Sequence, residues 1–129
     1  MRGPFFAMMA VIVVALVTAS AQKPRLSLVM EQKLEHSKAI LGAVVTSDWA
    51  TLDRESRALA RATQDPAWVV LTAPEYLRQS DAFQKALEEL IAASAKQDLD
   101  AASQAEVALT TSCVKCHQYV GRKRMVGRL

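Results

Sequence analysis

Glycine, proline and aromatic residues are scarce in this chain, so few residues interrupt a helix. Four glycines and four prolines are spread over 129 residues, and aromatic residues make up 5% of the total. The hydrophobic 51% is mostly alanine, leucine and valine, and alanine and leucine are strong helix formers. Residues 68–71 could pass for a strand, but one isolated strand has nothing to pair with. The composition and the one-domain length favour an all-α fold.

A strong excess of charge of one sign is also lacking. Sixteen basic and thirteen acidic residues give a formal net charge of +3. A chain so close to neutral is poorly suited to nucleic acid as its main partner. We find no acid–base constellation of the kind that a catalytic site needs, and therefore expect no enzymatic activity. There is also no internal repeat and no low-complexity segment.

The N-terminal segment has the features of a secretory signal peptide. Arg2 gives a positive start, residues 5–17 form an uncharged apolar run, and residues 19–21 offer the small-x-small pattern of a cleavage site. The run is shorter than the ~20 apolar residues of a membrane-spanning helix. No cysteine stands at the cleavage site, which disfavours a lipoprotein. We expect cleavage after Ala21, which leaves a periplasmic domain over residues 22–129 without stable membrane insertion. An uncleaved N-terminal anchor is the alternative.

Four later segments carry apolar residues at helical spacing. We expect helices over about residues 25–45, 48–63, 74–96 and 98–120. Pro66 and Pro74 mark the linker between the second and third segments, and Gly121 is a natural stop for the fourth. Short connections between helices imply antiparallel neighbours. The sequence therefore predicts an antiparallel up-down-up-down four-helix bundle.

The chain has two cysteines, and both lie beside a histidine near the C-terminus, in the string Cys113-Val114-Lys115-Cys116-His117. Thiols three positions apart on a helix project to the same side. Each can add across one vinyl group of a haem, and His117 is then carried to the iron as a ligand. This spacing is the attachment signature of c-type haem. It predicts one haem c per chain, bound covalently through Cys113 and Cys116.

Other uses of these residues fit less well. A structural zinc ion needs four protein ligands, and His36 could join the motif only if the first helix came close. Neighbouring Cys116 and His117 cannot readily take two corners of one tetrahedron. A thioredoxin-like pair needs a strand–helix context that is missing. A plain disulfide would leave His117 without a role. A redox switch at Cys113 and Cys116, in an exported helical module without haem, stays open as an alternative.

The position of the motif on the last of four alanine-rich helices resembles the class II cytochromes c, which comprise the cytochrome c-prime family and its low-spin relatives. Residues 96–99, which lead into residues 111–113, strengthen a resemblance that covers essentially the whole mature chain. Members commonly carry arginine four residues after the haem histidine, where this chain has Gly121 followed by Arg122. The resemblance implies a four-helix bundle and redox partner proteins. It also makes a homodimer one possible assembly, because such relatives often form dimers.

The resemblance further implies that the first helix supplies the sixth iron ligand. In the low-spin relatives a methionine of that helix takes this role, and Met30 matches its position. On the predicted inner face Met30 is in line with Leu34, Ser37 and Leu41. A thioether ligand tends to raise the reduction potential of a haem. The alternative is that Met30 only fills space in the core.

Two other side chains of the first helix compete less well for the iron. His36 falls off the predicted inner face and is interpreted as a surface histidine, and Lys33 would have to lose a proton to bind. With His117 and Met30 both bound, the iron would be six-coordinate and low-spin, as in a soluble electron carrier. Without Met30, five-coordinate iron would bind a small gas such as nitric oxide or carbon monoxide.

Overall fold

The computed structural model describes residues 25–68 and 72–126, with side chains up to residue 122. The helices are α2 (Arg25–Thr46), α3 (Trp49–Ala62), α4 (Pro74–Lys96) and α5 (Leu99–Val126), with the short 3-10 helix η1 (Pro66–Trp68) between α3 and α4. No strand occurs in these ranges, so the all-α prediction is confirmed. None of the helices in the described part is long and apolar enough to span a membrane. The expected signal peptide, residues 1–21, lies outside the described residues.

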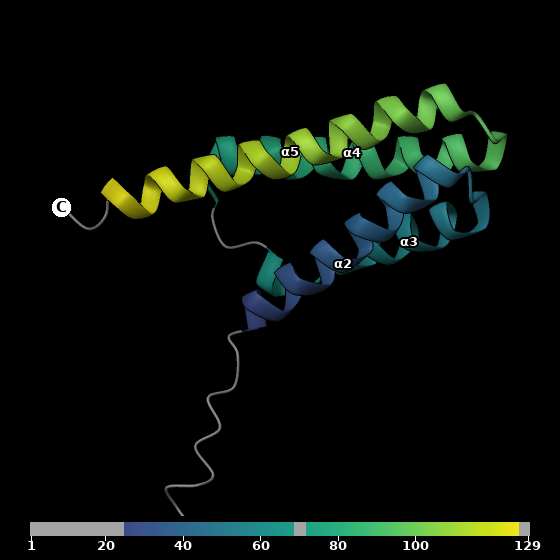
Figure 1. The fold of residues 1–129 in the computed structure, drawn as a ribbon. Coiled ribbons are helices and arrows are strands. Elements are labelled where there is room, and N and C mark those ends of the chain that lie inside the picture. The colour runs from purple at the N-terminus through teal and green to yellow at the C-terminus, as the bar shows by residue number, and fades with distance from the viewer. Residues whose placement is uncertain (1–24, 69–71, 127–129) are drawn as a thin grey trace, which may run out of the picture.

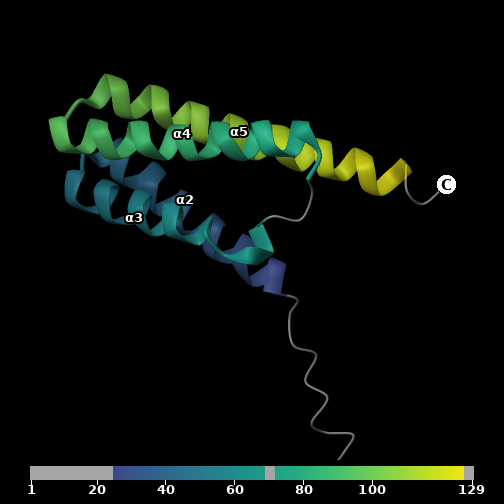
Figure 2. The same cartoon turned by 180° about the vertical axis from the view of Figure 1, so that it is seen from behind.

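The helices form two antiparallel hairpins, α2–α3 and α4–α5, which pack on each other as two layers (Figure 1). Seen from behind, α3 lies against α4 and so joins the two layers (Figure 2). The chain direction alternates from helix to helix, which confirms the predicted up-down-up-down bundle. The start of α2, η1 and the end of α5 lie at the same end of the molecule.

Both hairpins turn in the same way. Ser47 and Gln97 have left-handed backbone angles, with φ of 55° and 54°, and each is followed by an aspartate that caps the next helix. The carboxylate of Asp48 accepts a hydrogen bond from the amide of Thr51 at 3.1 Å, and that of Asp98 accepts one from the amide of Ala101 at 3.0 Å. Aspartate at this position satisfies an amide that the helix leaves free. These turns fix the antiparallel direction of each pair.

The core lies between the two layers and is built mainly from leucine, alanine and a few larger residues. Side chains from all four helices are fully enclosed, among them Ile40, Leu52, Leu59, Phe83, Leu87, Leu90 and Leu109. Trp68 of η1 closes one end of the core, with its ring centroid 5.1 Å from that of Phe83. Trp68 thus packs the short helix η1 onto the bundle.

The predicted inner face of the first helix was wrong in part. Leu34 and Leu41 are 55% and 51% exposed, whereas the buried residues of α2 are Val29, Lys33, Ile40, Ala43 and Val44. Apolar side chains occupy two adjoining sides of this helix, and spacing alone does not tell which side meets the core. Because α2 packs closely on α3 and only slightly on α5, its second apolar side stays open.

The predicted end of the fourth helix was also too early. Helix α5 continues through Gly121 to Val126, and its last turns project beyond the other helices (Figure 1). A side chain at position 121 would meet nothing within 4 Å. Glycine inside an exposed helix costs only ~1 kcal/mol relative to alanine, which is too little to end a helix that is otherwise unobstructed.

Leu90→Ala is expected to lower the free energy of unfolding by about 3 kcal/mol, because it removes a fully enclosed side chain and leaves a cavity. Chemical denaturation measures this loss. Leu34→Ala is the matched control, and its half-exposed side chain should account for less than about 1 kcal/mol. Equal losses at the two positions would contradict the core as described.

Candidate functional site

The motif residues lie on one stretch of α5, and only the two cysteines among them are partly buried. Cys113 and Cys116 are both partly buried and both free thiols, and Cys113 packs against the core. Burial raises the pKa of the Cys116 thiol. His117 is exposed. The helix therefore presents two thiols on its inner side, with an imidazole next to them at the surface.

Lys33 of α2 lies opposite the two thiols. It is only 7% exposed, and its Nζ is 4.1 Å from the ring centroid of Phe83 and 4.6 Å from that of Trp68. Burial lowers the pKa of the Lys33 ammonium, and electrostatic attraction to Cys113 and Cys116 acts in the opposite direction. Phe83 and Trp68 belong to the core against which Cys113 packs, so the Lys33 ammonium and Cys113 border the same core. The spacing of Lys33 with Ile40 and Val44 indicates this side of the helix, although lysine is usually exposed.

Met30 lies one helical turn before Lys33 on α2 and packs, partly buried, against the core. Helices α2 and α5 run in opposite directions, so the start of α2 lies beside the end of α5. Moving from Lys33 towards the start of α2 reaches Met30 after one turn, and the same direction along α5 runs from the thiols towards its C-terminal end. That direction leads from the thiols towards His117. The structure thus brings Met30 to the same end of the bundle as the motif.

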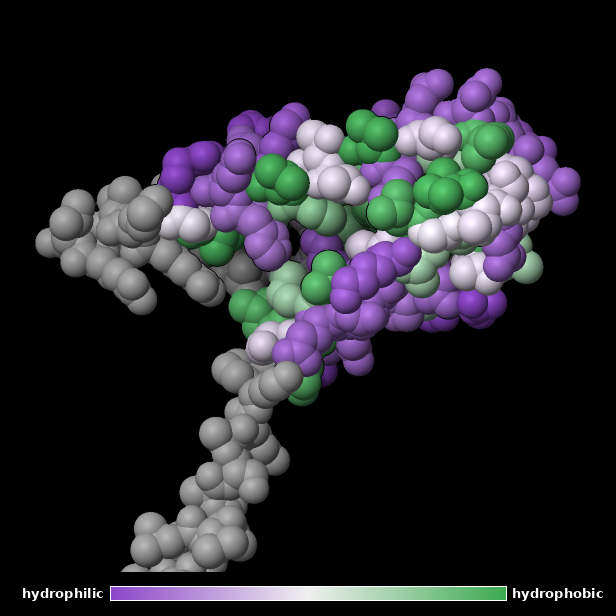
Figure 3. Space-filling model, viewed as in Figure 1, coloured by the Kyte–Doolittle hydropathy of each residue, from purple (hydrophilic) through white to green (hydrophobic). Residues whose placement is uncertain are grey.

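The two layers diverge at this end. Helix α2 and the last part of α5 separate as they approach it (Figures 1 and 2), and the space-filling view shows the surface hollowed between them (Figure 3). The start of α2 is fixed there by the ion pair of Arg25 with Asp65, whose Nη2 and Oδ2 atoms are 3.0 Å apart.

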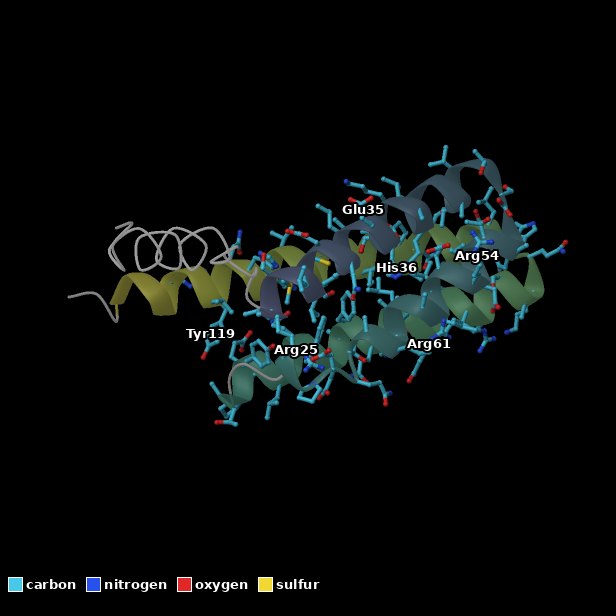
Figure 4. All side chains as sticks on the ribbon, turned by 90° about the horizontal axis from the view of Figure 1, so that it is seen from below. Arg25, Glu35, His36, Arg54, Arg61 and Tyr119 are labelled. Carbon is cyan, nitrogen blue, oxygen red and sulfur yellow. The ribbon has the colours of Figure 1, made fainter. Side chains whose placement is uncertain are left out.

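His36 is not brought to the motif. Its Nδ1 lies 2.7 Å from Oε2 of Glu55 on α3, and Figure 4 shows it between α2 and α3. The hydrogen bond to His36 lowers the pKa of Glu55. Among the described residues, no group of three or more histidine, cysteine, aspartate or glutamate side chains is placed to hold a metal ion. The four residues of the zinc alternative therefore do not meet in this structure.

Glu106 is a buried carboxyl group on the same side of α5, two turns before Cys113. It is 7% exposed; its Oε1 accepts a hydrogen bond from Oγ1 of Thr110 at 3.2 Å, and its Oε2 has no partner. Burial raises the pKa of this carboxyl. The regular spacing of Glu106 among the core positions of α5 is the signal that could have revealed its burial.

Glu106→Gln is expected to stabilise the fold at pH 7 by about 1 kcal/mol, because it replaces a poorly satisfied acid with a neutral group of the same shape. Because the pKa of the Glu106 carboxyl is higher in the folded state than in the unfolded state, the fold loses stability as the pH rises above the unfolded pKa of about 4.3. The gain should therefore shrink when unfolding is measured at pH 4. Glu89→Gln on the exposed side of α4 is the control, and a gain independent of pH would contradict the assignment.

A haem matches this arrangement on three observations. Two free, partly buried thiols lie one helical turn apart on α5, Met30 of α2 packs against the core at the same end, and that core contains the aromatic rings of Trp68 and Phe83. The described residues therefore offer both the covalent attachment points and the apolar surroundings that the group requires.

Comparison with known proteins adds no relative to this picture. No family model, no curated protein and no solved structure matches the chain.

Proposed function

We propose that this chain is an exported c-type cytochrome of class II that carries electrons between periplasmic redox partner proteins. One haem c would be held by Cys113 and Cys116, with His117 and Met30 as the two axial iron ligands. The observation that carries the proposal is the motif on the inner side of α5 with the Met30 end of α2 opposite it. Periplasmic location is part of the same proposal, and a homodimer is one possible assembly of the chain.

The two cysteines fix the prosthetic group to the fold. Each thiol would add across one vinyl double bond, so that sulfur forms a thioether with one carbon and the thiol proton goes to the other. Because Cys113 packs against the core, the attached group would be tied to the rigid part of α5. His117 follows on the same helical turn and supplies its imidazole from a position that the two thioethers define.

The bound haem would supply a one-electron change between ferric and ferrous iron. The chain's own residues keep its surroundings apolar and rigid. Trp68 and Phe83 shield the interior side from water, while the thiol of Cys116 stays partly exposed. Val114 and Lys115, between the two cysteines, are exposed. This surface is the place where a redox partner could approach the attached edge.

Met30 determines which of two functions follows. A thioether on the sixth position gives low-spin iron and an electron carrier, whereas an absent ligand gives five-coordinate iron beside an apolar surface, which suits nitric oxide or carbon monoxide. The partly buried position of Met30 at the motif end of α2 favours the carrier. The spacing to Lys33 supports it further, because that residue lies opposite the thiols.

Ferric and ferrous absorption spectra of the purified periplasmic protein test the proposal. Low-spin spectra with a sulfur-to-iron charge-transfer band would support the electron carrier. A high-spin ferric spectrum would support the gas-binding alternative. Absence of a Soret band would contradict both and would favour a redox switch at Cys113 and Cys116.

A further inference from the structure

The ammonium of Lys33 is buried, and no acidic side chain in the described part of the chain pairs with it. Its Nζ instead makes cation–π contacts with the rings of Phe83 and Trp68, and none of the ion pairs within the described ranges involves it. Contacts of a cation with aromatic faces favour its charged form but recover only part of the cost of burial. A lysine in such a position needs a reason beyond packing, since a methionine would fill the same volume.

The neighbouring charges do not cancel that of Lys33. Arg25 is paired with Asp65, His36 with Glu55, and Lys38 with Glu35. Burial raises the pKa of the Glu106 carboxyl, which disfavours its negatively charged form. Among these cations of α2, Lys33 is the buried one, and it forms no ion pair with a described carboxylate.

We propose that Lys33 raises the electron affinity of the haem site, because its buried ammonium lies over Phe83 and Trp68, in the same core against which Cys113, one of the proposed attachment points, packs. The inference rests on the proposed function. Ferric haem carries one more positive charge than ferrous haem, so a fixed cation nearby disfavours the oxidised form. Lys33 acts on the reduction equilibrium of the haem through its charge alone and forms no bond to the iron.

The size of the effect follows from Coulomb's law. Two unit charges about 10 Å apart, at an effective dielectric constant of about 20, change an equilibrium constant about tenfold. For a one-electron couple, tenfold corresponds to about 59 mV. An effect of this size is easily measured.

Redox titration of the haem-loaded protein, with spectra recorded alongside, tests the inference in three variants. Lys33→Met should shift the reduction equilibrium about tenfold towards the oxidised form and leave the ligand bands unchanged. Lys33→Arg keeps the charge and should stay within about twofold of the wild type. Lys38 is an exposed lysine of the same helix that is paired with Glu35. The Lys38→Met variant should therefore also keep a reduction equilibrium within about twofold of the wild type.

The outcomes separate the two proposals. A Lys33→Met protein with bound haem and a wild-type reduction equilibrium would overturn the role of Lys33 and leave the cytochrome proposal standing. A change in the ligand bands of Lys33→Met would also overturn this role, because it would make Lys33 an iron ligand. If Lys33→Met does not fold, a shift in Lys33→Arg as large as tenfold would overturn it as well. A chain that binds no haem at all would overturn both.

Discussion

A variant with serine at both Cys113 and Cys116 should carry no covalently bound haem after expression with a c-type maturation system. Hydroxyl groups do not form thioethers with the vinyl carbons under these conditions, and the rest of the site cannot replace two covalent bonds. Both cysteines are only partly buried, so serine should leave the helical content of the bundle unchanged. Haem staining of the denatured polypeptide measures the loss.

The single variants serve as controls for this prediction. Cys113→Ser and Cys116→Ser each keep one thiol on the inner side of α5, and each should retain at most one thioether. Circular dichroism checks that the double variant is still helical. Covalent haem on a folded double variant would show that the attachment site lies elsewhere.

Met30→Ala should convert a low-spin spectrum into a high-spin one and remove the sulfur-to-iron band. The methyl group of alanine cannot reach the iron, and no other methionine occurs in the part of α2 that faces the motif. Loss of the thioether should also lower the reduction potential, since thioether ligation tends to raise it. The open position should then bind carbon monoxide in the ferrous state.

Leu34→Ala is the matched control for Met30→Ala. It lies one turn away on α2 and is 55% exposed, so it removes an apolar side chain without touching the proposed ligand. Its spectrum should equal that of the wild type. An unchanged spectrum in Met30→Ala would show that Met30 does not bind the iron and would reduce it to a packing residue.

The fold was largely predictable because its determinants are local. Leucine and alanine repeat at helical spacing in α4, where Phe83, Leu87 and Leu90 are all buried as the pattern predicts. The aspartates at the two hairpin turns, Asp48 and Asp98, stand directly before helical apolar patterns, which is where a capping residue is expected. The attachment motif is equally local, since Cys113, Cys116 and His117 depend only on their separation along one helix.

Relations between helices were less predictable. Packing between α2 and α5 decides which apolar side of α2 meets the core. Because the two helices pack only slightly on each other, Leu34 and Leu41 lie at the surface. The burial of Lys33 requires two aromatic rings from η1 and α4 to meet on one side of α2. No spacing within α2 encodes that contact. The place of Met30 at the motif end follows from the opposite directions of α2 and α5, which the bundle topology implied.

The central claim is that two thiols on the closing helix hold a haem, and the mass of the intact mature polypeptide tests it most directly. We predict a mass that exceeds the polypeptide mass by one haem and keeps this excess after denaturation. A denatured chain with the polypeptide mass alone, from cells that mature other c-type cytochromes, would contradict the account.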